Sequence, residues 1–357
     1  MPDLTPLVDA ARQSELFTAP RLEADLARFL GEKSDAIRAL AHRVAGGEFE
    51  NVYFVGGGGS WANMFTGTYL LDRLTSVPAE TLTSYELVWR DPVRLGPRSL
   101  VFLASYSGAT EDTLAALRHA NARGAHTVAL VRRRAAGSPM AMEAGTTIDY
   151  DSTALYILPL ATVTLFALEL ARLTDSPRKA EAENALAALP ALATTLGKAY
   201  RDGEAAGRAA AERFLSATSL TVLAAGPLFG LGYKFALTVF MENIRVNGSI
   251  VESAEFRHGP VEALERTRLD VVALVGTDDS RDMTRRAIRT AEQNGARVLV
   301  IDAADYDVHP LLAPFVLLVP LQWFTVYSAL LRGITDLDER VFMGHRVLAT
   351  GPEATWP

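Results

Sequence analysis

Short apolar runs alternate with amphipathic stretches along most of the chain, and this alternation predicts a parallel sheet with helices on both faces. In the first half, the runs at 51–57 (NVYFVGG), 99–106 (SLVFLASY) and 126–132 (HTVALVR) have the composition of buried strands. Between the last two lies EDTLAALRHANARGA, with apolar residues at helical spacing and Gly124 at its end. We therefore expect an α/β fold.

A second series of apolar runs repeats the first. It comprises residues 221–227, 270–276, 297–303 and 315–320. Gly226 follows Gly56 by 170 residues, and Gly295 follows Gly124 by 171 residues, so the two series align almost without gaps. The sequence therefore predicts two tandem doubly wound, flavodoxin-like subdomains related by internal duplication.

The remaining segments complete the predicted domain organisation. Apolar positions at helical spacing near the N-terminus predict helices, and the Ala-rich stretch before residue 215 predicts one or two connecting helices. The expected parts are an N-terminal helical segment (1–46), a first subdomain (47–175), connecting helices (176–214), a second subdomain (215–335) and a C-terminal tail (336–357).

One stretch has the length and the apolar composition of a membrane-spanning helix. Residues 311–331 carry no charge and are long enough to cross a bilayer. Pro314, Pro320 and Gln322 interrupt it, so we expect a short strand, FVLLV, followed by a helix, both buried in a protein without a membrane partner.

Charge and composition exclude several classes of function. A net charge of −7 with dispersed acids argues against nucleic acid or anionic membrane as partner. The absence of cysteine excludes thiolate catalysis and disulfides, and six scattered histidines without HxH or HxxxH spacing suggest no metal site. The first residues lack the profile of a signal peptide, so we expect a cytoplasmic protein.

Two loops stand where ligands bind in open α/β sheets, beyond the carboxyl ends of strands. GGGGSWAN (56–63) includes Gly59 and Ser60, and SYSGATEDT (105–113) carries hydroxyls at Ser105, Ser107 and Thr110 directly before a helix. Such hydroxyls and free helix N–H groups suit a phosphate. The same residues also fit an ordinary helix cap and a tight turn, whereas a dinucleotide fingerprint fails because the third spaced glycine is missing.

Two further residues are candidates for proton transfer. Glu242 lies in an apolar helix expected from Tyr233 to about residue 246; it is either a buried base or a solvated residue paired with Arg245. In ESAEFRHGP the Gly-Pro corner keeps His258 out of a helix interior. An ordinary loop histidine has the same pattern.

The duplicated unit, the SxSGxT loop and the EFRHGP segment together resemble the sugar isomerase (SIS) domain family over nearly the whole chain. The runs AAGPLFGLGYK, IVESAEFRHGPVE and DDSRDMTRRAI look most like fructoselysine-6-phosphate deglycases, and more distantly like the isomerase domain of glucosamine-6-phosphate synthase. That synthase has a lysine where this chain has Val239, and another near its C-terminus that the tail GHRVLATGPEATWP lacks. Amide-dependent glucosamine synthesis is therefore disfavoured.

The resemblance implies a phosphosugar enzyme without cofactor. It implies a phosphate bound by Ser105, Ser107 and Thr110 with Gly59 and Ser60 nearby. The catalytic pair is a glutamate and a histidine 16 residues later, here Glu242 and His258, in a homodimer whose histidine comes from the partner chain.

The implied reaction cleaves a fructosamine 6-phosphate to glucose 6-phosphate and an amine or amino acid through an enaminol. The alternatives are an aldose-ketose or aminosugar-phosphate isomerase or deaminase, and a phosphosugar sensor without catalysis. Neither the amine nor the direction of the reaction follows from the sequence.

Overall fold

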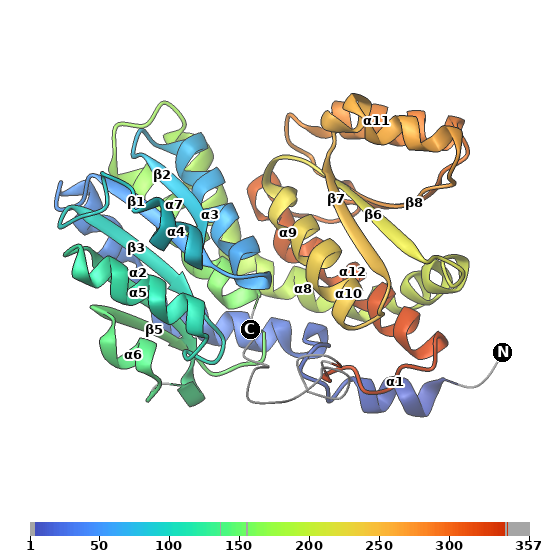
Figure 1. The fold of residues 1–357 in the computed structure, drawn as a ribbon, viewed down its shortest axis with the longest axis horizontal. Coiled ribbons are helices and arrows are strands. Elements are labelled where there is room, and N and C mark those ends of the chain that lie inside the picture. The colour runs from blue at the N-terminus through green and yellow to red at the C-terminus, as the bar shows by residue number, and fades with distance from the viewer. Residues whose placement is uncertain (1–3, 136, 155, 340, 342–357) are drawn as a thin grey trace.

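Two parallel sheets, each with its own helices, make up the computed structural model, which describes residues 4–135, 137–154, 156–339 and 341 (Figure 1). The strand order is β2-β1-β3-β4-β5 in the first sheet and β7-β6-β8-β9 in the second. The first is the flavodoxin-like order, and the second repeats its first four positions. The predicted α/β class with two doubly wound units is confirmed.

The strands are β1 Asn51–Gly56, β2 Ala79–Thr83, β3 Ser99–Ala104, β4 His126–Arg132, β5 Thr146–Tyr150, β6 Ser219–Ala224, β7 Asn247–Glu252, β8 Asp270–Val275 and β9 Arg297–Asp302. Strands β1, β3 and β8 are buried along their whole length because helices cover both faces. Three of the four edge strands, β2, β5 and β7, are only partly buried, and their mixed composition did not predict them. The fourth, β9, was predicted from its apolar run.

The helices are α1 Thr5–Ala11, α2 Leu22–Ala45, α3 Gly59–Leu74, α4 Ser84–Arg90, α5 Glu111–Ala122, α6 Pro139–Glu143, α7 Ile157–Leu173, α8 Lys179–Arg213, α9 Phe229–Lys234, α10 Phe240–Glu242, α11 Arg281–Gln293 and α12 Ala313–Leu331. The connecting segment forms one helix, α8, of 35 residues with Pro190 in its interior. It joins the two sheets and packs along α12.

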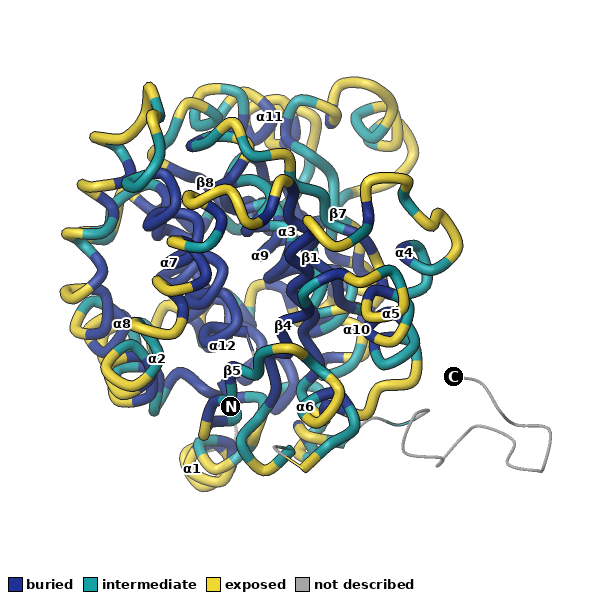
Figure 2. The backbone as a smooth tube through the Cα atoms, turned by 90° about the vertical axis from the view of Figure 1, so that its left-hand side faces the viewer, coloured by how far each residue is buried: buried dark blue, intermediate teal, exposed yellow. Residues whose placement is uncertain are grey.

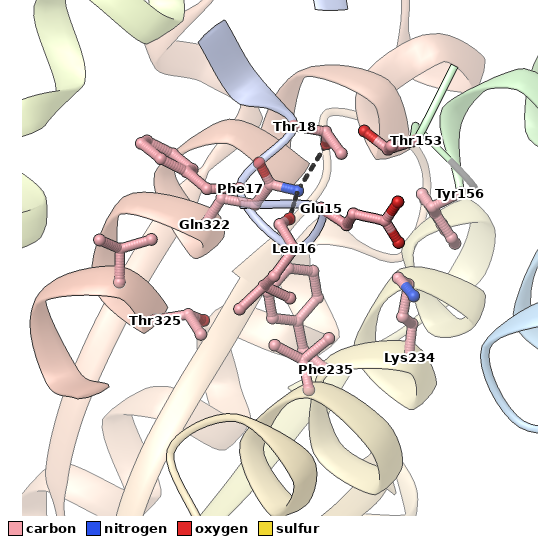
Figure 3. Close-up of a pocket in the computed structure, with 12 residues that line it drawn as sticks. Glu15, Leu16, Phe17, Thr18, Thr153, Tyr156, Lys234, Phe235, Gln322 and Thr325 are labelled. Carbon is pink, nitrogen blue, oxygen red and sulfur yellow. Dashed lines mark hydrogen bonds between the residues drawn. The ribbon is translucent and has the colours of Figure 1, made fainter. Parts of the chain in front are cut away.

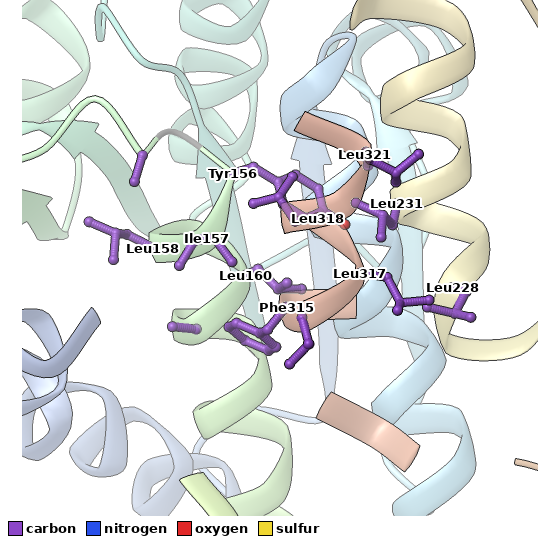
Figure 4. Close-up of a cluster of buried hydrophobic side chains, with 14 of the residues drawn as sticks. Tyr156, Ile157, Leu158, Leu160, Leu228, Leu231, Phe315, Leu317, Leu318 and Leu321 are labelled. Atoms are coloured by element: carbon purple, nitrogen blue, oxygen red, sulfur yellow. The ribbon is translucent and has the colours of Figure 1, made fainter. Parts of the chain in front are cut away.

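The prediction of a strand at FVLLV is wrong, because residues 315–319 belong to α12, which continues through Pro320. Figure 4 shows α12 between α7 and α9, with Phe315 facing Leu160 and Leu321 facing Leu231. A helix that is apolar on all sides gives no periodicity by which to distinguish it from a buried strand.

The same helix accounts for the apolar run of transmembrane length. Among the described residues, Pro310–Leu331 is the one helical segment long and apolar enough to cross a membrane, and 94% of its most apolar window is buried inside the protein. In Figure 2, α7 and α12 lie in the dark blue interior, whereas α1 and the outer face of α2 are exposed. This is the burial expected of a core helix.

The helix predicted from Tyr233 to about residue 246 is also different in the structure. It begins at Phe229, widens to a π-helix over Phe235–Val239 and ends with α10 at Glu242. Arg245 then has a φ of 55°, in the left-handed region, and turns the chain into β7.

Candidate functional site

The segment GGGGSWAN (56–63), called the glycine loop below, turns sharply from β1 into α3. Gly58 has a φ of 50° and a ψ of −122°, a conformation that side chains other than glycine rarely adopt. A Cβ built on Gly56 would lie 3.0 Å from the Ser60 backbone, so the turn also needs a glycine there for close approach. The first N–H groups of α3 therefore point toward the space beyond the carboxyl end of β1.

The segment SYSGATEDT (105–113) after β3, called the hydroxyl loop below, is ordered by hydrogen bonds among its own side chains. Ser105 Oγ lies 2.7 Å from Thr110 Oγ1, and the Ser107 and Thr110 hydroxyl oxygens lie 3.4 Å apart. Gly108 N–H donates to Ser105 Oγ over 3.1 Å. Thr110 occupies the N-cap position of α5, yet its side chain makes no capping hydrogen bond. Helix capping by the side chain therefore does not explain the presence of a threonine at position 110.

Strands β1 and β3 are neighbours at the point where the strand order of the first sheet reverses. Ligands in doubly wound folds bind outside the carboxyl ends of the strands at such a point. The two loops are adjacent there, since a Cβ built on Gly57 would lie 3.3 Å from Asp112 Oδ2 at the start of α5.

Helix α9 brings residues of the second unit to these loops. A Cβ on Gly230 would lie 2.5 Å from the backbone oxygen of Ala62, so the glycine permits α9 to pack closely on α3. Trp61 and Tyr233 complete this contact, with ring centroids 4.4 Å apart. The π-helix that follows has a wider turn, and π-bulges are frequent at functional sites. Residues 234, 238 and 242, on successive turns of this segment, line one cavity together with the two loops.

That cavity has a volume of about 610 Å³ and lies between the two units. Five of the predicted site residues line it together: Gly59, Ser60, Ser105, Thr110 and Glu242. Ser107 and His258 are not among its lining residues. Glu242 is half-buried, and Arg245, its suggested partner, pairs instead with Asp336 over 3.0 Å.

His258 lies on the surface at the end of a 3-10 turn, Glu255–His258. Phe256 is buried and anchors this turn in the core of the second unit, and Glu252 Oε2 accepts hydrogen bonds from the backbone N–H groups of Ala254 and Glu255. Gly259 follows with a φ of 145°. The corner therefore holds the imidazole outward, away from the walls of its own chain's cavity.

Sequence reasoning missed Lys234, which lines the cavity one turn before Thr238. A Cβ built on Gly59 would lie 2.9 Å from Lys234 Nζ, so the ammonium is directed at the glycine loop. The nitrogen also lies 5.5 Å from the centre of the Tyr156 ring. No sequence motif marked this lysine, because its position depends on the packing of α9 against α3.

The N-terminal segment and residues 337–338 close one side of the cavity. Asp338 accepts hydrogen bonds from the backbone N–H groups of Glu15 and Leu16 over 2.8 and 2.9 Å. Arg132 donates to Glu15 Oε1 over 3.0 Å. Burial and the nearby Glu15 charge raise the pKa of Tyr106 to about 12, so this phenol is protonated at neutral pH. The tail residues 342–357 lie outside the described part of the chain.

The corresponding loop of the second unit is filled by its own carboxylate. Cβ atoms built on Gly226 and Gly276 would lie 2.6 and 2.2 Å from the Asp278 carboxylate oxygens. Ser280 donates to this carboxylate through its backbone N–H and its hydroxyl. An external anion is thereby disfavoured at the second loop. Across the described ranges, no group of three or more His, Asp or Glu residues could hold a metal ion.

Comparison with known proteins gives a consistent picture. The family model described as SIS domain matches residues 49–172. The chain is 32% identical to fructoselysine 6-phosphate deglycase of Escherichia coli K12, over 90% of this chain and 93% of the relative, and 29% identical to fructosamine deglycase FrlB of Bacillus subtilis, over 79% and 88%. The C-terminal domain of glucosamine-fructose-6-phosphate aminotransferase from Francisella tularensis has the same fold, with a TM-score of 0.77 at 19% identity over 90% and 97% of the two chains.

Proposed function

This chain belongs to the SIS domain family, and from that premise we propose that it is a fructosamine-6-phosphate deglycase. The observation that supports this proposal most strongly is that one cavity is lined both by the hydroxyl loop of the first unit and by Glu242 of the second. Its volume of about 610 Å³ lies within the range of small-molecule sites. The two relatives described above, at 32% and 29% identity, are deglycases, which indicates an enzyme of the phosphosugar type.

The phosphate is proposed to bind at the N-terminus of α5. Ser105, Ser107 and Thr110 offer hydroxyl donors, and the first N–H groups of the helix add partial positive charge. Gly59 and Ser60, at the start of α3, lie on the same side of the cavity. Lys234 places a cation beside the glycine loop and favours an anionic substrate in a protein of negative net charge.

Glu242 is proposed as the base that removes a proton from C1 of the open-chain 1-amino-1-deoxyfructose 6-phosphate. The electron pair of the C1–H bond forms the C1–C2 double bond, and the carbonyl oxygen at C2 takes a proton, which gives an enaminol. Protonation at C2 then shifts the double bond to C1–N. Water adds to the resulting imine and releases glucose 6-phosphate and the amine.

His258 is proposed to handle the proton on the C2 oxygen or the ring oxygen, from the partner subunit of a homodimer. The fixed corner at Glu255–His258 and the outward position of the imidazole support this assignment. No metal or redox cofactor enters the proposed steps. The metabolic relatives and the buried position of α12 support a cytoplasmic enzyme.

The test is a panel of synthetic fructosamine 6-phosphates incubated with the purified protein, with glucose 6-phosphate measured by a coupled dehydrogenase. We expect release of glucose 6-phosphate together with an equal amount of amine. Interconversion of fructose 6-phosphate and glucose 6-phosphate without amine release from any adduct would favour the isomerase alternative instead.

A further inference from the structure

Lys234 is a charged residue of the cavity that takes no part in the bond-making steps proposed above. It is half-buried, and it lines the cavity of about 610 Å³ together with Glu242. It also lines a second cavity of about 40 Å³, whose walls include residues 15–18, Tyr156 and part of α12 (Figure 3). Lys234 therefore belongs to a wall of the site other than the hydroxyl loop, at which the phosphate is proposed to bind.

Packing fixes the ammonium group of Lys234 at the glycine loop. A Cβ built on Gly59 would lie 2.9 Å from Lys234 Nζ, so the nitrogen rests against the backbone at the start of α3. On another side, Nζ lies 5.5 Å from the centre of the Tyr156 ring, a distance typical of a cation–π contact. Figure 3 shows the lysine side chain directed from α9 toward Tyr156. The cation is therefore held at one place in the cavity wall.

Lys234 and Glu242 lie on one face of the same helical segment. They line the cavity with Thr238 between them, about one turn from each. A rise of about 1.5 Å per residue separates the two Cα atoms by about 12 Å along the helix axis. A Cβ built on Gly58 would lie 3.6 Å from Thr238 Cγ2, so the glycine loop follows this face as far as Thr238. A substrate in the cavity therefore meets the ammonium and the carboxylate along one wall.

The proposed reaction develops negative charge at one atom of the substrate. When Glu242 removes the C1 proton, the electron pair of the C1–H bond forms the C1–C2 double bond. The pair of the carbonyl double bond then moves to the oxygen on C2, the carbon next to the one from which Glu242 takes the proton. A fixed cation beside this oxygen stabilises a charge that the bound substrate does not yet carry, and it thereby lowers the barrier.

We propose that Lys234 is a catalytic residue that donates a hydrogen bond, and then its proton, to the oxygen on C2, which leaves the ring oxygen to His258. The proposal rests on the deglycase function. The oxygen that takes the proton becomes the hydroxyl group of the enaminol. The Glu242 carboxyl group then returns a proton to C2, and the double bond shifts to C1–N as an iminium ion. Addition of water to this ion releases the proton that restores the ammonium of Lys234, so water is the one co-reactant.

Two substrates separate the role of Lys234 from that of His258. A fructosamine 6-phosphate closes its furanose ring through the oxygen on C5, whereas its 5-deoxy analogue lacks this oxygen and stays open. Lys234→Met removes the charge and keeps the aliphatic stem. It should lower kcat for both substrates at least ~10²-fold and change KM less than ~3-fold, the pattern of an interaction made in the transition state. His258→Asn should lower kcat at least ~10-fold more for the ring-forming substrate than for the 5-deoxy analogue.

The absence of cysteine from the sequence permits a rescue experiment. Lys234→Cys treated with 2-bromoethylamine regains an ammonium at nearly the length of lysine, whereas iodoacetamide adds a neutral group of similar size. The aminoethylated form should have a kcat at least ~10-fold above that of the neutral form, since the two differ mainly in charge. Lys198→Cys, at an exposed lysine of α8, is the control and should keep the wild-type kcat with either reagent.

A rise in KM at unchanged kcat in Lys234→Met would show that Lys234 only binds the substrate, and would overturn the proposal. Equal kcat values of the two alkylated forms of Lys234→Cys would overturn it as well. Equal losses of kcat by His258→Asn on the two substrates would contradict the division of the two oxygens between lysine and histidine. Failure of the wild type to release amine from either substrate would overturn the deglycase function itself, whereas release by an unimpaired Lys234→Met overturns the role of Lys234 alone.

Discussion

Thr110 occupies a capping position without capping its helix, and this makes it the most informative residue of the proposed phosphate site. Thr110→Val keeps the shape of the side chain and removes only the hydroxyl. We expect the KM for the phosphorylated substrate to rise ~10-fold or more, the order expected for a hydrogen bond to a charged group. Because the Thr110 hydroxyl also lies 2.7 Å from Ser105 Oγ, the melting temperature should fall slightly as well.

Thr83 provides a matched control for this substitution. It is also an N-cap threonine without a capping hydrogen bond, at the start of α4 beyond a strand of the same sheet, and it does not line the cavity. Thr83→Val should leave KM unchanged. Equal kinetic effects of the two variants would contradict the proposal that the substrate phosphate binds at the hydroxyl loop.

The site residues differ in how far the sequence could predict them. Ser105, Thr110, Gly59 and Ser60 follow strands directly, so strand position and loop chemistry were sufficient to bring them together. Glu242 required the family resemblance, because a carboxylate near a helix end is usually solvated. Lys234 carries no local signal at all, since it reaches the glycine loop only through the contact between α9 and α3.

At the level of elements, Gly230 determines how closely α9 packs against α3. Gly230→Ala would place its methyl group 2.5 Å from the Ala62 backbone oxygen, which cannot rotate away. Helix α9 must then shift, and Lys234 and Glu242 shift with it. We expect a loss of kcat of ~10-fold or more together with a lower melting temperature, because small displacements of catalytic groups have large effects.

Gly31→Ala is the control for this prediction. Gly31 lies in α2 with nothing within 4 Å of a built Cβ, so alanine should raise the melting temperature through helix propensity and leave kcat unchanged. Full activity of Gly230→Ala would show that the close packing of α9 does not position the site.

The C-terminal end of β9 gives a prediction about pH. Burial alone would raise the pKa of Asp302, but hydrogen bonds from Arg281 and the Ala304 backbone N–H, and the charges of Arg281 and Arg285, outweigh it and lower the pKa. A lowered folded-state pKa stabilises the protein above the unfolded-state value of about 3.9, and this contribution is lost as the pH falls through the folded-state pKa.

Asp302→Asn should therefore melt at a lower temperature than the wild type at pH 7, and the difference should shrink as the pH falls below about 4. Thermal unfolding of both proteins from pH 3 to pH 8 measures this. A difference that stays constant across the range would mean that the asparagine perturbs packing rather than the charge pairs.

Helices and strands could be predicted from the sequence where burial of one face of a helix, or of both faces of a strand, leaves a clear pattern of apolar residues. The strands β1, β3, β4, β6, β8 and β9 were found because their apolar runs are short and bounded by turns. Helix α12 was partly misread as a strand, since an all-apolar run interrupted by Pro320 has no period. The π-helix at Phe235–Val239 also escaped, because its extra residue per turn follows from packing rather than from composition.

At the scale of the whole molecule, the outward position of His258 leads to a prediction about assembly. If Glu242 of one subunit works with His258 of its partner, a heterodimer of Glu242→Gln and His258→Ala contains one intact site. Mixing the two inactive variants under exchange conditions should restore about a quarter of the wild-type activity, because half of the dimers are mixed and each has one intact site of two. No recovery after verified exchange would place both residues in the same chain's site.

Proton exchange at carbon tests the proposed chemistry most directly. In deuterium oxide, the wild type should incorporate deuterium at C1 of recovered fructosamine 6-phosphate and at C2 of the glucose 6-phosphate product, both seen by NMR. Glu242→Gln preserves the volume of the side chain and removes the base, so exchange and product formation should both fall at least ~10²-fold while substrate binding is retained. Glu292→Gln, an exposed acid on α11, serves as the control and should behave as the wild type. Exchange and turnover of Glu242→Gln at the wild-type rate would contradict the assignment of Glu242 as the base and, with it, the proposed mechanism.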